Sequence, residues 1–154
     1  MSASPTYHIT AVGHAIVDVI APCDEAFLTA QDLTRGAMTL VDDARSAALY
    51  DAMAAGVEAS GGSAGNTIAG AASFGARCAY IGKVADDQLG QVFRHDLKAQ
   101  GAFFGTGALK DGPATGRCLI NVTPDGQRTM ATCLGAASKV GPEDVDPALV
   151  ADSR

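Results

Sequence analysis

A chain of 154 residues, of which 47% are hydrophobic, can bury about 70% of its unfolded surface, so a packed core needs neither metal nor disulfide. The net charge is -6 and the basic residues are scattered singly, so neither nucleic acid nor an anionic membrane is an expected partner. No apolar stretch approaches the roughly 18 residues of a membrane span, and the first residues lack the basic start and apolar run of a signal peptide. We therefore expect a cytoplasmic protein.

The composition is typical of α/β enzymes, in which helices and strands approach one another closely. Aromatic residues make up only 5% of the chain, Trp is absent, and there are 18 glycines. The four cysteines form no C-x-x-C pair, which argues against a zinc site and a redox motif. We expect buried free thiols at Cys23, Cys78, Cys118 and Cys133.

The first hundred residues alternate between strand and helix patterns. Strands are expected where β-prone or apolar residues run together, at residues 7–12, 15–20, 37–41, 57–59 and 78–84. Helices are expected between them, at residues 24–30, 42–54, 63–74 and from 86 to about 100, the last with apolar residues at helical spacing. This alternation favours a parallel sheet with right-handed crossovers.

The pattern changes after Gly101. Two strand patterns, at residues 115–122 and 127–133, are joined by Pro124-Asp125-Gly126, a turn sequence with Gly where a positive φ is needed. We predict a β-hairpin there. Short helices are expected to start near Pro142 and Pro147.

Two segments have a composition suited to binding. Asp18 is a single carboxylate in the otherwise apolar residues 15–20, and we expect it at a strand end, beside the crevice where open α/β sheets bind ligands. Capping of a turn would also explain it. In residues 60–66, a glycine-rich turn, Gly61 and Gly62 would let a ligand reach backbone N–H groups at a helix start. Tight packing alone would also explain these glycines.

Spacing argues against two common phosphate-binding loops. A Walker loop needs G-x-x-x-x-G-K-[ST], but Gly82-Lys83 is followed by Val84, and Arg77 stands five residues before Gly82. A dinucleotide loop needs G-x-G-x-x-G after the first strand, which here ends in Gly13-His14-Ala15. An NAD-linked oxidoreductase is therefore a weak alternative.

Four segments, in the same order as in the family, resemble the PfkB (ribokinase-like) carbohydrate kinases. Besides the segments around Asp18 and Gly61, residues 82–90 (GKVADDQLG) look like the N-terminal signature of the family and residues 126–130 (GQRTM) look like a lid strand. The resemblance covers about residues 7–150. Residues 38–42 (MTLVD) and 61–64 (GGSA) are most similar to bacterial members called adenosine kinases or general sugar kinases.

The resemblance implies an α/β fold, with a parallel central sheet flanked by helices and a small β-strand lid. The lid would be formed by segments at about residues 15–42 and 114–134. Residues 1–154 would be the N-terminal portion of this kinase domain, with the C-terminal half of the fold absent, because the chain stops soon after the lid hairpin.

The resemblance also implies a substrate site. The carboxylate of Asp18 would accept hydrogen bonds from sugar hydroxyls, Gly61 and Gly62 would let the sugar lie against the backbone, and Asn66 would add an amide. Five apolar side chains would flank a nucleoside base: Ile16, Met38, Leu40, Met130 and Leu134. Packing in the core or the lid would also explain these residues. Arg128 is the expected cation on the phosphate path, with a solvated hairpin arginine as the alternative.

His14 departs from the family pattern, since relatives resembling adenosine kinase usually carry Asn there. An imidazole can still donate to a hydroxyl, so His14 stays among the expected substrate-binding residues, but purine selectivity does not follow. His8 and His95 have no ligand spacing to His14, and no metal site is expected.

Family members transfer the γ-phosphate of ATP, with Mg²⁺, to a substrate hydroxyl, using a G-A-G-D-type segment whose Asp is the base. No such segment occurs in residues 1–154. We therefore predict the nucleoside- or sugar-binding half of a kinase, inactive alone and without bound ATP; a non-catalytic binding fragment is the alternative. Lid strands or an open sheet edge could also mediate self-association.

Overall fold

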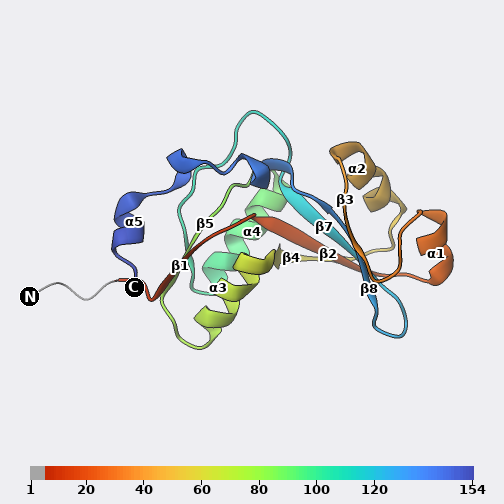
Figure 1. Cartoon of the computed structure of the whole chain (residues 1–154), viewed down its shortest axis with the longest axis horizontal. Helices are drawn as coiled ribbons and strands as arrows, with labels where there is room; N and C mark the ends of the chain where they lie inside the picture. Colours follow the sequence, from red (N-terminus) through yellow and green to blue (C-terminus); the bar gives the residue numbers. More distant parts are fainter. Residues whose placement is uncertain (1–5) are drawn as a thin grey trace, which may run out of the picture.

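The computed structural model describes residues 6–154, and its strands form two sheets (Figure 1). The smaller sheet is entirely parallel, with the order β1 (Ile9–Val12), β5 (Cys78–Ile81), β6 (Phe103–Phe104). The larger sheet is mixed and has the order β3 (Met38–Leu40), β8 (Arg128–Cys133), β7 (Gly116–Val122), β2 (Ile16–Pro22), β4 (Val57–Gly61).

Aspartate side chains fix the starts of three helices. Asp24, Asp42 and Asp87 each accept a hydrogen bond from the amide three residues later, which satisfies a donor that the helix leaves unpaired. The helices that follow are α1 (Glu25–Ala30), α2 (Asp43–Ala52) and α4 (Gln88–Ala99). The others are α3 (Ser63–Ser73), α5 (Pro147–Ala151) and two 3₁₀ helices, η1 (Gly135–Lys139) and η2 (Pro142–Asp144).

Two apolar clusters hold these layers together. In the first, α3 and α4 pack on the parallel sheet, and the rings of Tyr80, Phe93 and Phe104 lie 5.4–5.8 Å apart between centroids. In the second, Leu49 of α2 packs against Leu119 on one face of the five-stranded sheet. That face is therefore covered, and the opposite face is left for other contacts.

The predicted α/β class and the hairpin are confirmed. Strands β7 and β8 pair antiparallel, and Gly126 takes a φ of +83° at their turn. All four cysteines are free thiols as expected; three are buried and Cys23 is partly exposed.

Two local predictions were wrong, and two short elements were not predicted. The segment expected as a strand at residues 57–59 is not in the parallel sheet, because β4 runs antiparallel to β2 in the larger sheet. Asp18 is the third residue of the seven-residue strand β2, not its end. The two-residue strand β6 and the helix η1 were not predicted, since neither is long enough to show a period.

Two carboxylates of helix α4 and its N-cap accept hydrogen bonds that connect the two sheets. Its N-cap, Asp87, accepts from the backbone amide of Thr115 at 2.8 Å and from its hydroxyl at 2.6 Å, immediately before β7 begins. Asp96, near the other end of α4, accepts from the backbone amide of Ser60 in β4 at 2.8 Å. The five-stranded sheet is thus held at two of its strands to α4, which packs on the parallel sheet.

Between residues 6 and 154, no helix combines the length and apolar character of a bilayer span.

We expect Asp87→Asn to lower the free energy of unfolding, because charge-assisted hydrogen bonds to Thr115 and Gly90 are lost. Burial tends to raise the pKa of Asp87, but these hydrogen bonds outweigh it and the pKa lies below the ordinary value. The carboxylate therefore stabilises the fold above the unfolded pKa of about 3.9, and this contribution is lost as the pH falls through the lower folded pKa.

Urea unfolding as a function of pH checks this. The difference between the wild type and Asp87→Asn should be constant near neutral pH and shrink below about pH 4. Asp111→Asn, at an exposed loop position, is the matched control and should leave stability almost unchanged. A difference for Asp87→Asn that persists undiminished into strong acid would contradict the assignment.

Candidate functional site

Asp18 lies on the face of the five-stranded sheet opposite to α2. Residues directly opposite one another on neighbouring strands point to the same side, so the register defines a row across the sheet: Ala59, Asp18, Cys118, Thr132 and Leu40. The next row on this side is apolar throughout: Val57, Ile20, Ile120, Met130 and Met38. We call this side of the sheet the Asp18 face.

The carboxylate of Asp18 occupies the space that a side chain at residue 61 would need. A Cβ built on Gly61 would overlap the carboxyl carbon and both carboxyl oxygens of Asp18. Gly61 pairs with Ile16, two residues before Asp18 on the same face. The structure therefore brings together two of the residues that the sequence singled out.

The surroundings of Asp18 change the pKa of its carboxyl group. Its side chain is partly buried, and none of the described residues donates a hydrogen bond to its carboxylate. Burial raises the pKa of Asp18 above its ordinary value, and the positive charge of Arg128 acts in the opposite direction. Both oxygens are thus available as acceptors for a ligand.

Two residues of the Asp18 row were not predicted from the sequence as site residues. Cys118 pairs directly with Asp18, and the hydroxyl of Thr132 lies 3.2 Å from the sulfur of Cys118. Burial is the main cause of the raised pKa of Cys118; the Thr132 hydrogen bond lowers it and the nearby Asp18 charge raises it. The hairpin turn at Gly126 implies that Cys118 faces Thr132, but nothing local indicates that β2 lies beside them.

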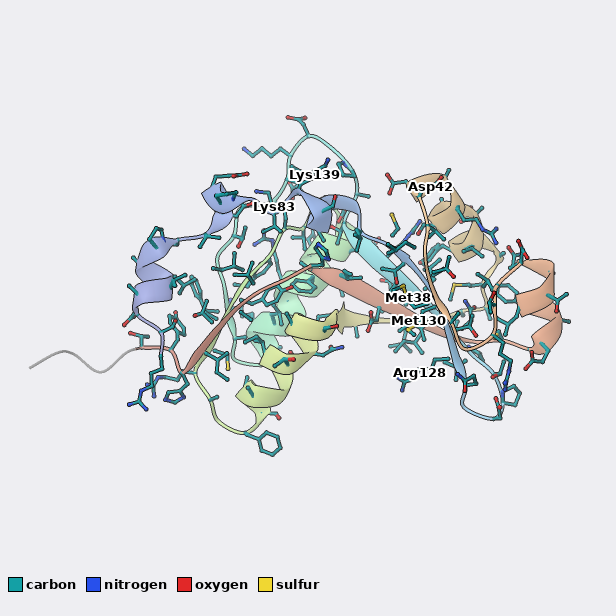
Figure 2. The ribbon with its side chains drawn as sticks, viewed as in Figure 1. Met38, Asp42, Lys83, Arg128, Met130 and Lys139 are labelled. Atoms are coloured by element: carbon teal, nitrogen blue, oxygen red, sulfur yellow. The ribbon has the colours of Figure 1, made fainter. Side chains whose placement is uncertain are left out.

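The predicted apolar residues gather on the Asp18 face. Ile16 is buried in a cluster with Cys118 and Ile120, and Met130 and Leu134 pack against this cluster. Met38 and Leu40, on the edge strand β3, are 56% and 62% exposed. Figure 2 shows Met38, Met130 and Arg128 close together along the β3–β8 side of the sheet.

The remaining predicted residues lie around the start of α3. Gly62 has a φ of +82°, and a Cβ there would approach the backbone oxygen of His14 to 2.8 Å. His14 itself is exposed in the link between β1 and β2. Asn66 lies in the first turn of α3 with an exposed side chain, and its backbone amide donates to the Gly62 carbonyl at 2.8 Å. Asn66 follows Gly61 by five residues in the sequence, but within the described chain its side chain makes no hydrogen bond to Asp18.

A hollow adjoins the Asp18 face where β3 and β8 end. Its lining includes three residues of the Asp18 face or next to it, Leu40, Thr132 and Leu134, and three charged residues, Asp42, Asp43 and Lys139. Figure 2 shows Asp42 and Lys139 at that end of the sheet. In the described chain, no group of three or more His, Cys, Asp or Glu side chains could hold a metal ion. The arrangement suits a ligand with hydroxyl donors for Asp18 and a flat apolar part for the neighbouring row.

We expect Gly61→Ala to destabilise the fold by about 1–3 kcal/mol, because the added methyl group must displace the Asp18 carboxylate. Gly70→Ala is the matched control, since a Cβ there meets nothing within 4 Å and alanine favours a helix interior by about 0.8–1 kcal/mol. Urea unfolding of both variants checks this. Equal stabilities for Gly61→Ala and the wild type would show that Asp18 does not fill this space.

Arg128→Gln should raise the pKa of Asp18 further, because it removes the positive charge that opposes the effect of burial. Arg117→Gln is the control: Arg117 lies on the opposite face, where it donates to Ser46 and stacks over Tyr50. NMR titration of the Asp18 carboxyl carbon measures the shift. An unchanged pKa in Arg128→Gln would place the guanidinium too far away to act on the site.

Comparison with known proteins supplies the family. A model described as pfkB family carbohydrate kinase matches residues 7–152. The structure of adenosine kinase from Sinorhizobium meliloti is 53% identical, with a TM-score of 0.90, and is matched over 96% of this chain and 45% of that chain. The "probable sugar kinase protein" from Rhizobium etli is 48% identical, with a TM-score of 0.91, over 97% and 45% of the two chains.

A more distant structure shows the same fold. Adenosine kinase from Schistosoma mansoni in complex with adenosine is 20% identical, with a TM-score of 0.83, over 99% of this chain and 46% of that chain. The comparison with curated proteins gives no match. The chain spans less than half the length of each of these three structures, and it belongs to the pfkB family of carbohydrate kinases.

Proposed function

We propose that this chain forms the substrate-binding half of a kinase that phosphorylates a hydroxyl of a nucleoside or sugar, with adenosine as the first candidate. Family membership supports the reaction class. The 53% identity to an adenosine kinase supports the choice of adenosine. The five-stranded sheet would act as a lid over the ligand.

One observation carries the proposal: the Asp18 carboxylate is partly buried on an apolar sheet face and receives no hydrogen bond from the described residues. Desolvating a charge without a partner is unfavourable, so such a group is best explained by a ligand that supplies the donors. Sugar hydroxyls are donors of this kind. Gly61, which has no side chain, leaves room for the carboxylate at that point.

The physical role of each residue follows from its place. A hydrogen bond from a hydroxyl to the ionised Asp18 would contribute about 1.5–3 kcal/mol. The apolar row with Met38 and Met130 would cover the flat face of a base. Asn66 and His14 would add donors from the α3 side, and Arg128 would face the phosphate end.

ATP with Mg²⁺ is the proposed phosphate donor of the complete enzyme, where it would supply the γ-phosphoryl group. Among the described residues, no group of three or more His, Cys, Asp and Glu side chains could hold a metal ion, and the sequence contains no G-A-G-D segment. We therefore assign no residue of this chain to Mg²⁺. We expect the chain alone to bind substrate without transferring phosphate.

Calorimetry on this chain, without ATP, tests the binding half of the proposal. Adenosine should bind more tightly than ribose, because only adenosine covers the apolar row. Adenosine binding should also weaken as the pH falls through the raised pKa of Asp18, since the protonated carboxyl loses its charge. Binding of neither ligand would reject the proposal that this chain alone forms the site.

A chimaera tests the role of Asp18 in turnover. This chain would replace the aligned part of the Sinorhizobium meliloti adenosine kinase, and kcat/KM for adenosine would be measured with Asp18→Asn and with the exposed control Asp111→Asn. We expect a loss of more than tenfold, about 1.4 kcal/mol, for the first variant only. A smaller loss would show that Asp18 does not bind the substrate.

A further inference from the structure

The polar side chains of the Asp18 face lie in one row. The strand register places Ala59, Asp18, Cys118, Thr132 and Leu40 side by side, and the neighbouring row is apolar throughout. Within the row, Asp18, Cys118 and Thr132 carry the polar groups, on the adjacent strands β2, β7 and β8. A ligand that contacts Asp18 can therefore continue along the row to Thr132.

The length of this row discriminates between ligands of different size. Neighbouring strands lie about 4.7–4.9 Å apart, so Thr132 is roughly 10 Å from Asp18 across the sheet. The carboxylate of Asp18 also leans away from Thr132, into the space beside Gly61 of β4, and β4 lies on the other side of β2 from β7. A single sugar ring bound to Asp18 is too short to reach Thr132, whereas a nucleoside is long enough to bring its base there.

The hydroxyl of Thr132 donates to a weak partner. Thr132 is only 7% exposed, and its hydroxyl donates to the sulfur of Cys118 over 3.2 Å. A thiol sulfur accepts hydrogen bonds weakly. A ligand atom that is a better acceptor can therefore take this proton with little loss to the protein.

Thr132 also lines the hollow at the end of β3 and β8, together with Leu40 and Leu134. The hollow has a volume of about 440 Å³, within the range of about 300–1,000 Å³ that is usual for small-molecule sites. Its wall thus combines apolar side chains with the buried hydroxyl of Thr132. A flat ring with a hydrogen-bond acceptor at its edge matches this combination.

We propose that Thr132 is a specificity-determining residue whose hydroxyl donates a hydrogen bond to a ring nitrogen in the base of a nucleoside substrate. This assignment rests on the proposed function, in which Asp18 binds the sugar hydroxyls. It names a nucleoside, and not a free sugar, as the substrate class. A base without an acceptor at this position is disfavoured, because the Thr132 hydroxyl then keeps only the sulfur of Cys118 as its partner.

Calorimetry of adenosine binding to Thr132→Val tests the proposal, because valine keeps the branched shape of threonine and removes the hydroxyl. We expect about tenfold weaker binding. Thr132→Ser, which retains the hydroxyl, should bind adenosine almost as tightly as the wild type. Thr39→Val is the matched control, since Thr39 is exposed and pairs with Ala131 on the opposite face, and its affinity should be unchanged. Equal affinities of Thr132→Val and the wild type would overturn the proposal.

Analogues of adenosine identify the atom that accepts from Thr132. In each analogue one acceptor nitrogen of the base is replaced by C–H. One of them should bind the wild type about tenfold more weakly than adenosine does and lose nothing further in Thr132→Val, because both changes remove the same hydrogen bond. Losses that add for every analogue would reject the assignment.

NMR of the threonine methyl groups provides a measurement on the wild type in case Thr132→Val fails to fold. The Thr132 signal should shift when adenosine is added and the Thr39 signal should not; an unchanged Thr132 signal would reject the proposal. If Asp18→Asn weakens adenosine binding and Thr132→Val does not, this inference alone fails. If the wild type binds no nucleoside, the proposed function fails and this inference fails with it.

Discussion

The packing around the Asp18 carboxylate is the constraint to which the site and its surroundings are adapted. The Asp18 carboxylate lies among apolar side chains on a sheet face, and the nearest identified counter-charge, Arg128, acts on it without forming a hydrogen bond within the described chain. Desolvation makes this arrangement unfavourable in the free protein. The missing side chain at Gly61 permits the arrangement, because any larger residue would compete with the carboxylate for the same volume.

Packing and hydrogen bonds elsewhere in the molecule hold the sheet that carries Asp18 in place. The face opposite to Asp18 is packed against α2, so the sheet cannot turn that side towards a ligand. Helix α4 ties both the start of β7 and the strand β4 to the parallel sheet, through Asp87 and Asp96. A rigid support matters for the proposed site, because a group that is to hold a hydroxyl within hydrogen-bond distance tolerates errors of only about 0.5 Å.

Local signals in the sequence predicted the helices and the hairpin well. Asp24 and Asp42 are helix caps with side chains that bond to nearby amides, and Gly126 marks a turn that needs a positive φ; each depends only on residues a few positions away. The family resemblance supplied the order of the segments, which explains why the fold class was confirmed.

The pairing of strands that are far apart in the sequence could not be predicted. Whether β4 runs beside β2 or in the parallel sheet depends on residues more than 30 positions apart, and both arrangements have the same alternation of strands and helices. The same limit hid Cys118 and Thr132, since their place beside Asp18 exists only when β2, β7 and β8 are assembled. Asn66 shows the opposite case: its position at a helix start was predictable, but its side chain makes no hydrogen bond to any residue between 6 and 154 that would establish a role.

The bond between Asp96 and the Ser60 amide has one more consequence. It occupies a donor of β4, one of the two outermost strands of the five-stranded sheet, and leaves β3 as the other border. Since β3 is only three residues long, it offers few backbone groups as a template for intermolecular stacking. An apolar face of this sheet can therefore stay partly exposed while few free backbone groups at its two borders are available for edge-to-edge pairing.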